Sequence, residues 1–199
     1  MANLENENKE IINEQKMKVF SKEYFKYKFS VPYLKSGMGN IWKKYILFFC
    51  ILVSILVIDL VTKSVFDGKI YSFLDGFVSI DGNHHNTGAG FSLFSNATGL
   101  LLAISIICVI VYFAFEYLTM ENKRGYTYYI STSLMVAGTL GNLIDRANLG
   151  YVRDFIKLEF MDFPVFNIAD CALTIGVILF AIWLIFLEGK ERGKAYAKN

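Results

Sequence analysis

Four long apolar segments constrain the fold of this chain more than any other feature. They lie at about residues 45–66, 99–115, 126–144 and 171–187. A helix needs about 20 apolar residues to cross roughly 30 Å of hydrocarbon, so each segment predicts a transmembrane helix. The composition agrees, because 54% of the chain is hydrophobic and 19% charged, whereas soluble domains average about 45–50% and about 25%. We therefore expect an all-α membrane protein, a four-helix transmembrane bundle.

The distribution of basic residues predicts how this bundle is oriented. Lysine and arginine gather before the first segment, between the second and third, and after the fourth, at Lys35, Lys43, Lys44, Lys123, Arg124, Lys190, Arg192, Lys194 and Lys198. The positive-inside rule then places both termini in the cytoplasm and the loops 67–98 and 145–170 outside. This divides the chain into a cytoplasmic tail (1–44), a four-span domain (45–189) and a second cytoplasmic tail (190–199).

The N-terminal tail leaves two interpretations open. Residues 16–29 interleave lysines with aromatic side chains, which is typical of an amphipathic helix on a membrane surface, but a disordered tail fits the composition equally well. Residues 1–44 carry nine lysines and five glutamates, an excess that suits anionic lipid and does not indicate a nucleic-acid partner. The first apolar segment follows a leader of about 44 residues and is longer than the 7–15 apolar residues usual in a signal peptide. We therefore expect a retained anchor and not a cleaved signal peptide.

The first outer loop contains short β-prone pieces at residues 69–73 and 76–80. Turn signals stand at Asp75-Gly76 and at Asp81-Gly-Asn83. The loop therefore predicts a small antiparallel sheet resting on the membrane. The adjacent His84 and His85 lack an HExxH pattern, and three cysteines at unrelated spacings form no zinc or disulfide framework, so we expect no metal and no cofactor.

Polar residues on three of the apolar segments approach the same, outer side of the membrane. Asp59 and Lys63 are four residues apart in the first segment and share a helix face. Asn142 and Asp145 lie on one stripe of the third segment, and Asp170 begins the fourth. An ionised side chain at the centre of a bilayer costs about 2.5–3.5 kcal/mol on insertion scales, so these groups need partners or a task.

Several of these residues have structural interpretations. Asp59 and Lys63 fit an interfacial ion pair as well as a site, Asp145 and Arg146 are best explained as a structural pair at a helix end, and Gly138 and Gly141 as packing residues.

Asp154 and Asp170 are the strongest candidates for chemistry. Asp154 lies in the strand-like run 151–156 and Asp170 follows Phe166-Asn-Ile-Ala, so both have hydrophobic neighbours. The simpler alternative makes Asp170 a helix N-cap and Asp154 a solvated loop acid. We favour a catalytic pair. Two carboxylates about 4 Å apart repel by about 4 kcal/mol at an effective dielectric constant of 20, so the pair would share one proton near neutral pH.

At this point the sequence resembles the lipoprotein signal peptidase family, also called signal peptidase II. The resemblance covers about residues 46–187. It rests on five motifs in order: Asp59-x-x-x-Lys63, Asn86-Thr-Gly-Ala89, Gly138-x-x-Gly-Asn-x-x-Asp-Arg146, Val152-Arg-Asp-Phe155 and Phe166-Asn-x-Ala-Asp170. Each motif is weak by itself, but the five together, at compatible spacing in a chain with four apolar segments, are specific.

The resemblance implies a four-helix transmembrane bundle with a small extracytoplasmic β-cradle, in the bacterial cytoplasmic membrane. It implies an aspartic endopeptidase that cleaves diacylglyceryl-modified prolipoproteins just before the lipidated cysteine, with Asp154 and Asp170 as the catalytic residues. Substrate binding or support of the pair falls to Asn86, Gly88, Ala89, Asn142, Arg146, Asn167 and Ala169. Structural roles fall to Asp59, Lys63, Gly138, Gly141 and Asp145. We expect a monomer in contact with membrane lipid.

Two other classes of protein compete with this interpretation. A small transporter or channel predicts polar groups through the full depth of the bundle, whereas the inner halves of these segments are almost free of charge. A non-catalytic membrane scaffold predicts that Asp154 and Asp170 tolerate replacement by asparagine.

Overall fold

The computed structural model describes residues 38–74, 76–88, 98–118 and 124–189. The two interpretations of the N-terminal tail and the C-terminal tail fall outside these residues. All of the contacts below lie within the compact unit formed by residues 43–199. The elements are α4 (Met38–Phe66), β1 (Ile70–Leu74), β2 (Val78–Asn86), α5 (Thr98–Leu118), α6 (Tyr126–Leu149), β3 (Val152–Leu158), α7 (Ile168–Ile182) and the π-helical turn η2 (Trp183–Leu187).

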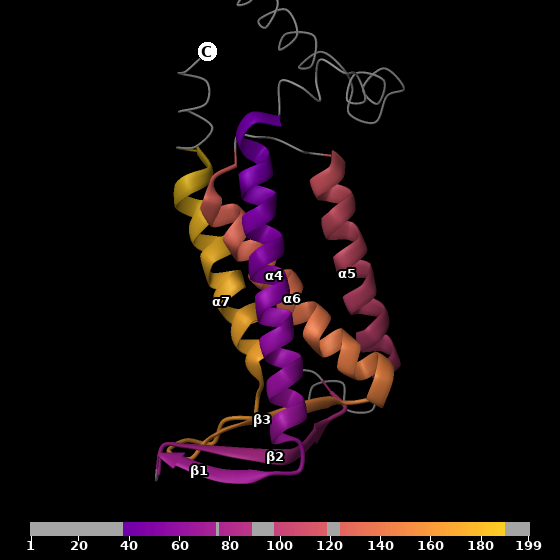
Figure 1. The fold of residues 1–199 in the computed structure, drawn as a ribbon, viewed down its shortest axis with the longest axis vertical. Helices are drawn as coiled ribbons and strands as arrows, with labels where there is room; N and C mark the ends of the chain where they lie inside the picture. Colours follow the sequence, from indigo (N-terminus) through magenta and orange to yellow (C-terminus); the bar gives the residue numbers. More distant parts are fainter. Residues whose placement is uncertain (1–37, 75, 89–97, 119–123, 190–199) are drawn as a thin grey trace, which may run out of the picture. The chain divides into compact units, whose positions relative to one another are not determined.

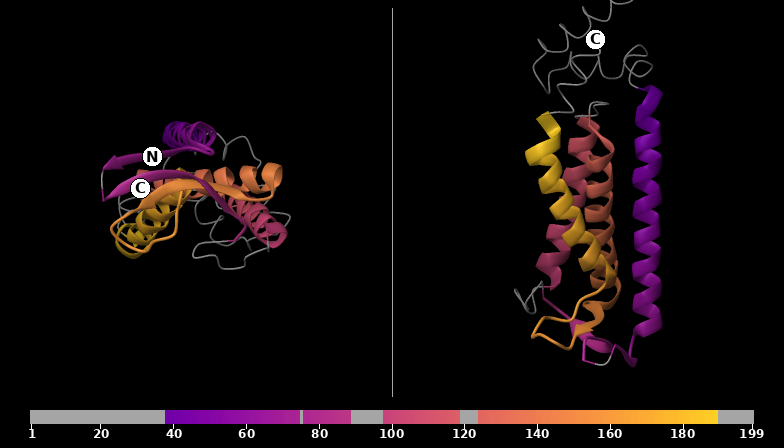
Figure 2. Two further views of the ribbon diagram at one scale, coloured as in Figure 1. Left: turned by 90° about the horizontal axis from the view of Figure 1, so that it is seen from below. Right: turned by 90° about the vertical axis from the view of Figure 1, so that its left-hand side faces the viewer.

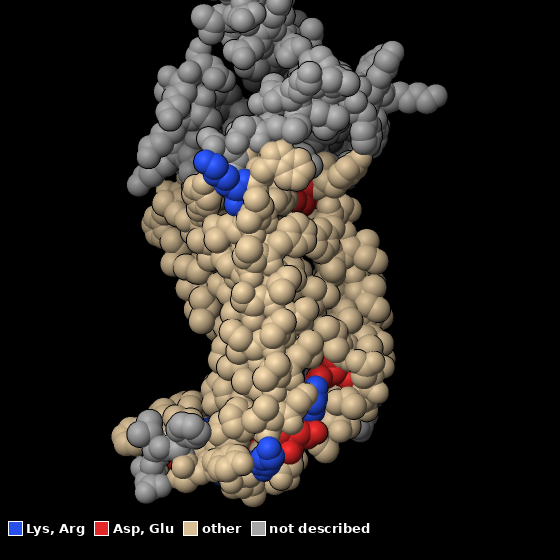
Figure 3. All heavy atoms as spheres, viewed as in Figure 1, with Lys and Arg blue, Asp and Glu red and all other residues tan. Residues whose placement is uncertain are grey.

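Three of the described helices are long and apolar enough to cross a membrane: α4 from Ile41, α5 to Tyr117, and α7 together with η2. On the face shown in Figure 3, charged side chains gather toward the two ends of the molecule, and a broad belt without charged side chains lies between them. The predicted spans at 45–66, 99–115 and 171–187 are thus confirmed as long apolar helices.

The predicted span at 126–144 is also helical, but α6 differs from the other three helices in composition. It does not reach their apolar character, because its buried residues include Ser131, Thr132, Ser133 and Asn142. These side chains face neighbouring helices and not lipid. The helix also continues five residues further than expected, to Leu149, where Gly150 ends it in a left-handed conformation with φ of 80°.

Close contact between α6 and its neighbours depends on small residues. A Cβ atom at Gly138 would collide with the carbonyl oxygen of Ala169 on α7, and one at Gly141 would collide with the Asp59 carboxylate on α4. Gly176 of α7 would meet Met135 of α6 at 2.8 Å. This close approach is what the predicted packing role of Gly138 and Gly141 requires. Away from the sheet, the buried core comprises Phe48, Leu52, Tyr128, Tyr129, Val136, Ala137 and Trp183.

The three described strands form an antiparallel sheet in the order β1-β2-β3. The expected small sheet is confirmed, and its third strand comes from the second outer loop. Figures 1 and 2 show that it lies across one end of the helices, where α4 and α6 terminate. Its position brings β2 and β3 next to the first turn of α7, since Phe166 pairs with Ile156.

One predicted turn is wrong. Asp81-Gly-Asn83 does not reverse the chain but lies inside β2, where the pairing with β3 shifts between Ile80 and His84. Gly82 is required there, because a Cβ atom would collide with the carbonyl group of Phe66. A glycine within a strand commonly marks a bulge or a close backbone approach, and this one marks both. The other predicted turn keeps Gly76 at φ of 80°.

Candidate functional site

Asp154 lies in the interior of the sheet end of the molecule. It belongs to β3 and pairs with His84 of β2, and only 2% of the residue is exposed. One carboxylate oxygen accepts a hydrogen bond of 2.9 Å from the Asn86 side chain, and the other accepts one of 2.6 Å from Asn167. The alternative interpretation of Asp154 as a solvated loop acid is therefore wrong.

Asp170 occupies the first turn of α7. The N-cap of this helix is Asn167, not Asp170, so the simpler interpretation of Asp170 was wrong by three residues. The two residues form a reciprocal capping box: the Asp170 amide donates to the Asn167 side chain at 3.0 Å, and the Asn167 amide donates to the Asp170 carboxylate at 3.1 Å.

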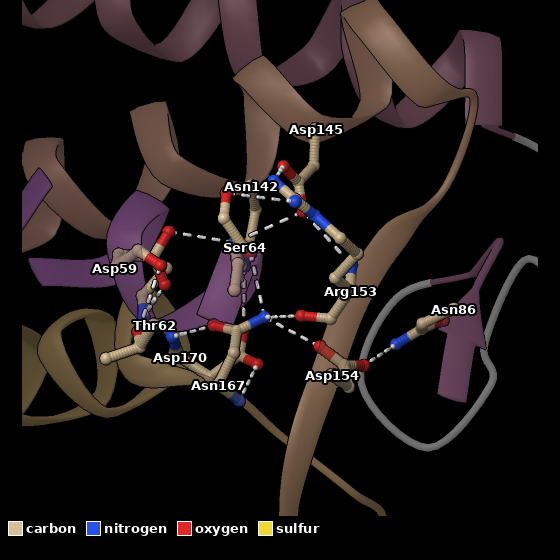
Figure 4. A network of polar contacts seen from close by, with 12 residues as sticks. Asp59, Thr62, Ser64, Asn86, Asn142, Asp145, Arg153, Asp154, Asn167 and Asp170 are labelled. Atoms are coloured by element: carbon tan, nitrogen blue, oxygen red, sulfur yellow. Dashed lines mark hydrogen bonds and ion pairs between the residues drawn. The ribbon is translucent and has the colours of Figure 1, made fainter. Parts of the chain in front are cut away.

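Two asparagines join the aspartates into one network (Figure 4). Asn167 contacts both carboxylates: its side-chain amide donates to Asp154 and its backbone amide donates to Asp170. Asn142 of α6 donates to the other oxygen of Asp170 at 2.8 Å, and its own carbonyl oxygen accepts a hydrogen bond of 3.1 Å from Asn167. Strand β3, helix α6 and the start of α7 thus meet at two carboxyl groups that are separated by 15 residues in the sequence.

A buried lysine connects this network to α4. Lys63 is fully buried and donates to the Asn142 carbonyl oxygen at 2.9 Å. It also pairs with Asp59 at 2.8 Å and lies 3.7 Å from Asp145. Asp59 in turn accepts a hydrogen bond of 2.9 Å from the backbone amide of Ala169 in the first turn of α7. The Asp59–Lys63 pair is therefore not an isolated interfacial pair, because it fixes the helix start that presents Asp170.

The expected pair of Asp145 and Arg146 does not form. Asp145 instead accepts three hydrogen bonds from Arg153, from its backbone and its guanidinium, at 2.8–3.2 Å. Arg146 points elsewhere and donates to the carbonyl oxygen of Gly88 at 2.8 Å. Adjacent residues on a helix point in different directions, so strand β3 supplies the partner of Asp145. Arg153 stands beside Asp154 in the sequence, and its motif was the only sequence signal for this role.

The segment after β2 forms the rim of the site. The backbone amide of Gly88 donates to the Asn86 side-chain oxygen at 2.9 Å, so the same asparagine orders the rim and binds Asp154. Gly88 is buried and is held by Arg146. The prediction for Ala89 falls outside the described residues.

The family model described as Signal peptidase (SPase) II matches residues 51–186. The chain belongs to the signal peptidase II family. Among curated relatives, it is 37% identical over 151 residues to a lipoprotein signal peptidase of Lactiplantibacillus plantarum, covering 73% of this chain and 99% of the relative. It is 38% identical over 152 residues to that of Staphylococcus haemolyticus, covering 72% and 94%.

Solved structures agree with this membership of the signal peptidase II family. A bacterial membrane enzyme determined by the in meso method at 1.9 Å resolution matches with a TM-score of 0.62 and 34% identity, over 71% of this chain and 94% of that one. A second, at 2.3 Å, has a TM-score of 0.63 and 35% identity, over 70% and 87%. Together with the three apolar helices, these similarities establish a membrane-embedded protein.

The environment of Asp154 gives this family member an acid that titrates near neutrality. Burial, and to a lesser extent the neighbouring Asp170, raise the pKa of Asp154 from 3.8 to about 7, although hydrogen bonds from Asn86 and Asn167 and the charge of Lys63 oppose the shift. At neutral pH this carboxyl group is therefore partly protonated. A protonated and an ionised carboxyl held by one asparagine can supply an acid and a base to the same reaction.

Proposed function

We propose that this protein is an aspartic endopeptidase that removes the signal peptide from diacylglyceryl-modified bacterial prolipoproteins, cutting just before the lipidated cysteine. The observation that carries the proposal is that Asn167 hydrogen-bonds to both Asp154 and Asp170. The relatives support it, because lipoprotein signal peptidases match nearly the full length of the peptidase domain. The protein would act as a monomer that needs neither metal nor cofactor.

In the proposed topology α4, α5, α6 and α7 all cross the cytoplasmic membrane, with both termini in the cytoplasm. Helix α6 also spans the membrane despite its polar composition, since many of its polar residues are buried and Asn142 bonds to Lys63 of α4 and to Asp170 of α7. The sheet end would face outward, because the loops there lack the basic excess found at the other end. The candidate site then lies at the outer boundary of the bilayer, within reach of an exported substrate.

The proposed reaction uses one water molecule and the two carboxyl groups. Ionised Asp170 removes a proton from water while the oxygen attacks the scissile carbonyl carbon, and protonated Asp154 transfers its proton to the carbonyl oxygen. The resulting tetrahedral diol collapses: the carbon–nitrogen bond breaks, the leaving amine takes a proton from Asp170, and one diol hydroxyl returns its proton to Asp154. The cycle forms no acyl-enzyme and restores both carboxyl groups. The pKa values of such a pair belong to the pair as a whole.

The surrounding residues would position the reactants. Asn86, Asn142 and Asn167 hold the carboxyl groups, as their hydrogen bonds indicate. Arg146 and Gly88 would form the substrate-facing rim. Ala169 supports the pair from behind, since it is fully buried and its amide is bound by Asp59. The acyl chains of the substrate would remain in lipid between the helices, which places the cysteine beside the aspartates and supplies much of the orientation that raises the rate.

The test is incubation of the purified protein with a lipidated prolipoprotein, followed by mass measurement of the product. The expected product begins at the lipidated cysteine. Asp154→Asn and Asp170→Asn should abolish cleavage in protein that remains folded and membrane-extractable. The matched control is Asp162→Asn, which changes an exposed acid in the connection between β3 and α7 and should leave cleavage unchanged. Substantial activity in either site variant would reject the aspartate pair and favour a scaffold.

A further inference from the structure

Helix α5 has an unusual distribution of buried residues. Between Thr98 and Tyr117, Glu116 is the only residue that is buried, and it is 4% exposed. The large apolar residues of this helix are exposed instead, among them Leu100, Ile107, Ile110 and Val111. In a membrane the exposed apolar surface faces lipid, and the carboxylate must find its partners inside the protein. The sequence-based expectation of almost charge-free inner halves missed this residue, because α5 continues past the predicted end at residue 115.

Glu116 gathers donors from three parts of the chain. One oxygen accepts a hydrogen bond of 3.0 Å from the hydroxyl of Tyr45 on α4. The other accepts 2.8 Å from the hydroxyl of Tyr128 on α6, and pairs at 2.7 Å with Arg124 just before that helix. We call these four residues the polar clamp. It lies at the end of the bundle away from the sheet, where α4 and α6 begin and α5 ends (Figure 1).

Aromatic contacts join α5 to α4 near this clamp. Tyr112 stacks on Phe48 of α4 with ring centroids 5.9 Å apart, and Phe113 contacts the same ring edge-on at 6.4 Å. Between α5 and α6 lies a cavity of about 190 Å³, whose lining includes Phe115 and the clamp residue Tyr128 at one end and Thr139 at the other. A cavity removes packing contacts, so along this stretch the polar bonds of the clamp supply much of what holds the two helices together.

The other end of α5 reaches the rim of the candidate site. The Thr98 hydroxyl donates to the carbonyl oxygen of Thr87 at 3.1 Å. Thr87 stands between Gly88, which Arg146 holds, and Asn86, which binds Asp154. A displacement of this end of α5 would therefore pull directly on the residues that surround Asp154.

We propose that α5 is a lever: the polar clamp fixes its sheet-distal end, and its sheet end moves away from α6 and carries the rim of the site with it. Movement of this kind opens a side passage from the lipid to the aspartates, wide enough for a substrate that carries acyl chains. The lever is inferred from the anchoring of α5 at the clamp, whereas its use for substrate entry rests on the proposed function.

The test measures spin-label distances by pulsed electron resonance in protein whose native cysteines have been replaced. One pair reports on the sheet-distal end, at Ala114 of α5 and Ile185 of η2, and the other on the sheet end, at Leu100 of α5 and Ile175 of α7. All four positions are exposed. We expect a narrow distance distribution for the first pair and one about twofold broader for the second. Equal, narrow distributions at both ends would overturn the lever.

Glu116→Gln should broaden the sheet-distal distribution to the width of the sheet-end one, because it removes the charge that holds Arg124. The double variant Tyr45→Phe with Tyr128→Phe keeps this ion pair and should broaden the sheet-distal distribution partly. If Glu116→Gln does not fold, this double variant tests whether the clamp anchors α5. The control is Glu159→Gln. The Glu159 carboxylate accepts a hydrogen bond from the Ser79 hydroxyl in the sheet, and its replacement should change neither distribution. Unchanged sheet-distal distances in the clamp variants would refute the clamp as anchor.

Substrate entry has its own measurement. Addition of a lipidated prolipoprotein to uncleaving Asp154→Asn protein should shift the sheet-end distances and leave the sheet-distal ones in place. If the lever is present without this shift, α5 does not form the substrate passage. The proposed function is decided separately, by cleavage in the wild-type protein.

Discussion

The hydrogen bond from Asn86 to Asp154 provides a quantitative test of the acid assigned to the proposed reaction. The donor lies 2.9 Å from the carboxylate, and Asp154 is 2% exposed, so water cannot easily replace it. A hydrogen bond to a charged group contributes about 1.5–3 kcal/mol, and each pKa unit corresponds to about 1.36 kcal/mol. Asn86→Ala should therefore raise the pKa of Asp154 from about 7 by about one to two units.

The sign of the effect follows from the ionised form, which loses a donor when Asn86 is removed, so that Asp154 keeps its proton to higher pH. If protonated Asp154 is the catalytic acid, the alkaline limb of the kcat/KM profile for lipidated prolipoprotein should move upward by the same one to two units, whatever the overall loss of rate. Ser79 lies on β2 like Asn86 but away from the aspartates, so Ser79→Ala should leave the alkaline limb in place. An unmoved limb, or one displaced to lower pH, would show that Asp154 is not the acid.

Three further predictions concern stability. Because burial raises the pKa of Asp154 from 3.8 to about 7, the wild-type protein should lose up to roughly 4 kcal/mol as the pH rises between these values; Asp154→Asn should therefore raise the Tm relative to wild type more at pH 8 than at pH 4. Lys63→Met removes the cationic partner of the buried Asp59 carboxylate and should cost about 3–5 kcal/mol, measured by thermal unfolding in detergent. Gly138→Ala should cost about 1–3 kcal/mol through collision with Ala169, whereas Gly99→Ala, in open space, should be tolerated; equal Tm values for the two glycine variants would contradict this.

Much of the site could be predicted because several of its parts are local in sequence. Asn167 and Asp170 lie three residues apart, which is the spacing of a capping box, and Asp59 and Lys63 lie on one helix face. The prediction nevertheless assigned the cap to the wrong member of its pair. A carboxylate and an amide can both cap a helix, and which one does so depends on where the chain enters the helix.

Other features could not be predicted, because they depend on which segments become neighbours. Arg153 binds Asp145 only because β3 returns beside the end of α6, and Glu116 is buried only because Tyr45, Arg124 and Tyr128 converge on it. The turn expected at residues 81–83 became a bulge for the same reason, since the approach of Phe66 requires Gly82 within a strand.

The amino-acid sequence alone was sufficient to determine a membrane protein with long apolar helices, a small sheet and a set of polar residues on shared helix faces, because hydrocarbon thickness and the periodicities of helices and strands act within single segments. Tertiary structure decided which of those polar residues bond to one another, that Asp154 is buried beside Asp170, and that Glu116 of α5 is buried among Tyr45, Arg124 and Tyr128. These properties arise from contacts between segments far apart in the chain, whose burial and mutual electrostatics do not exist until the segments pack.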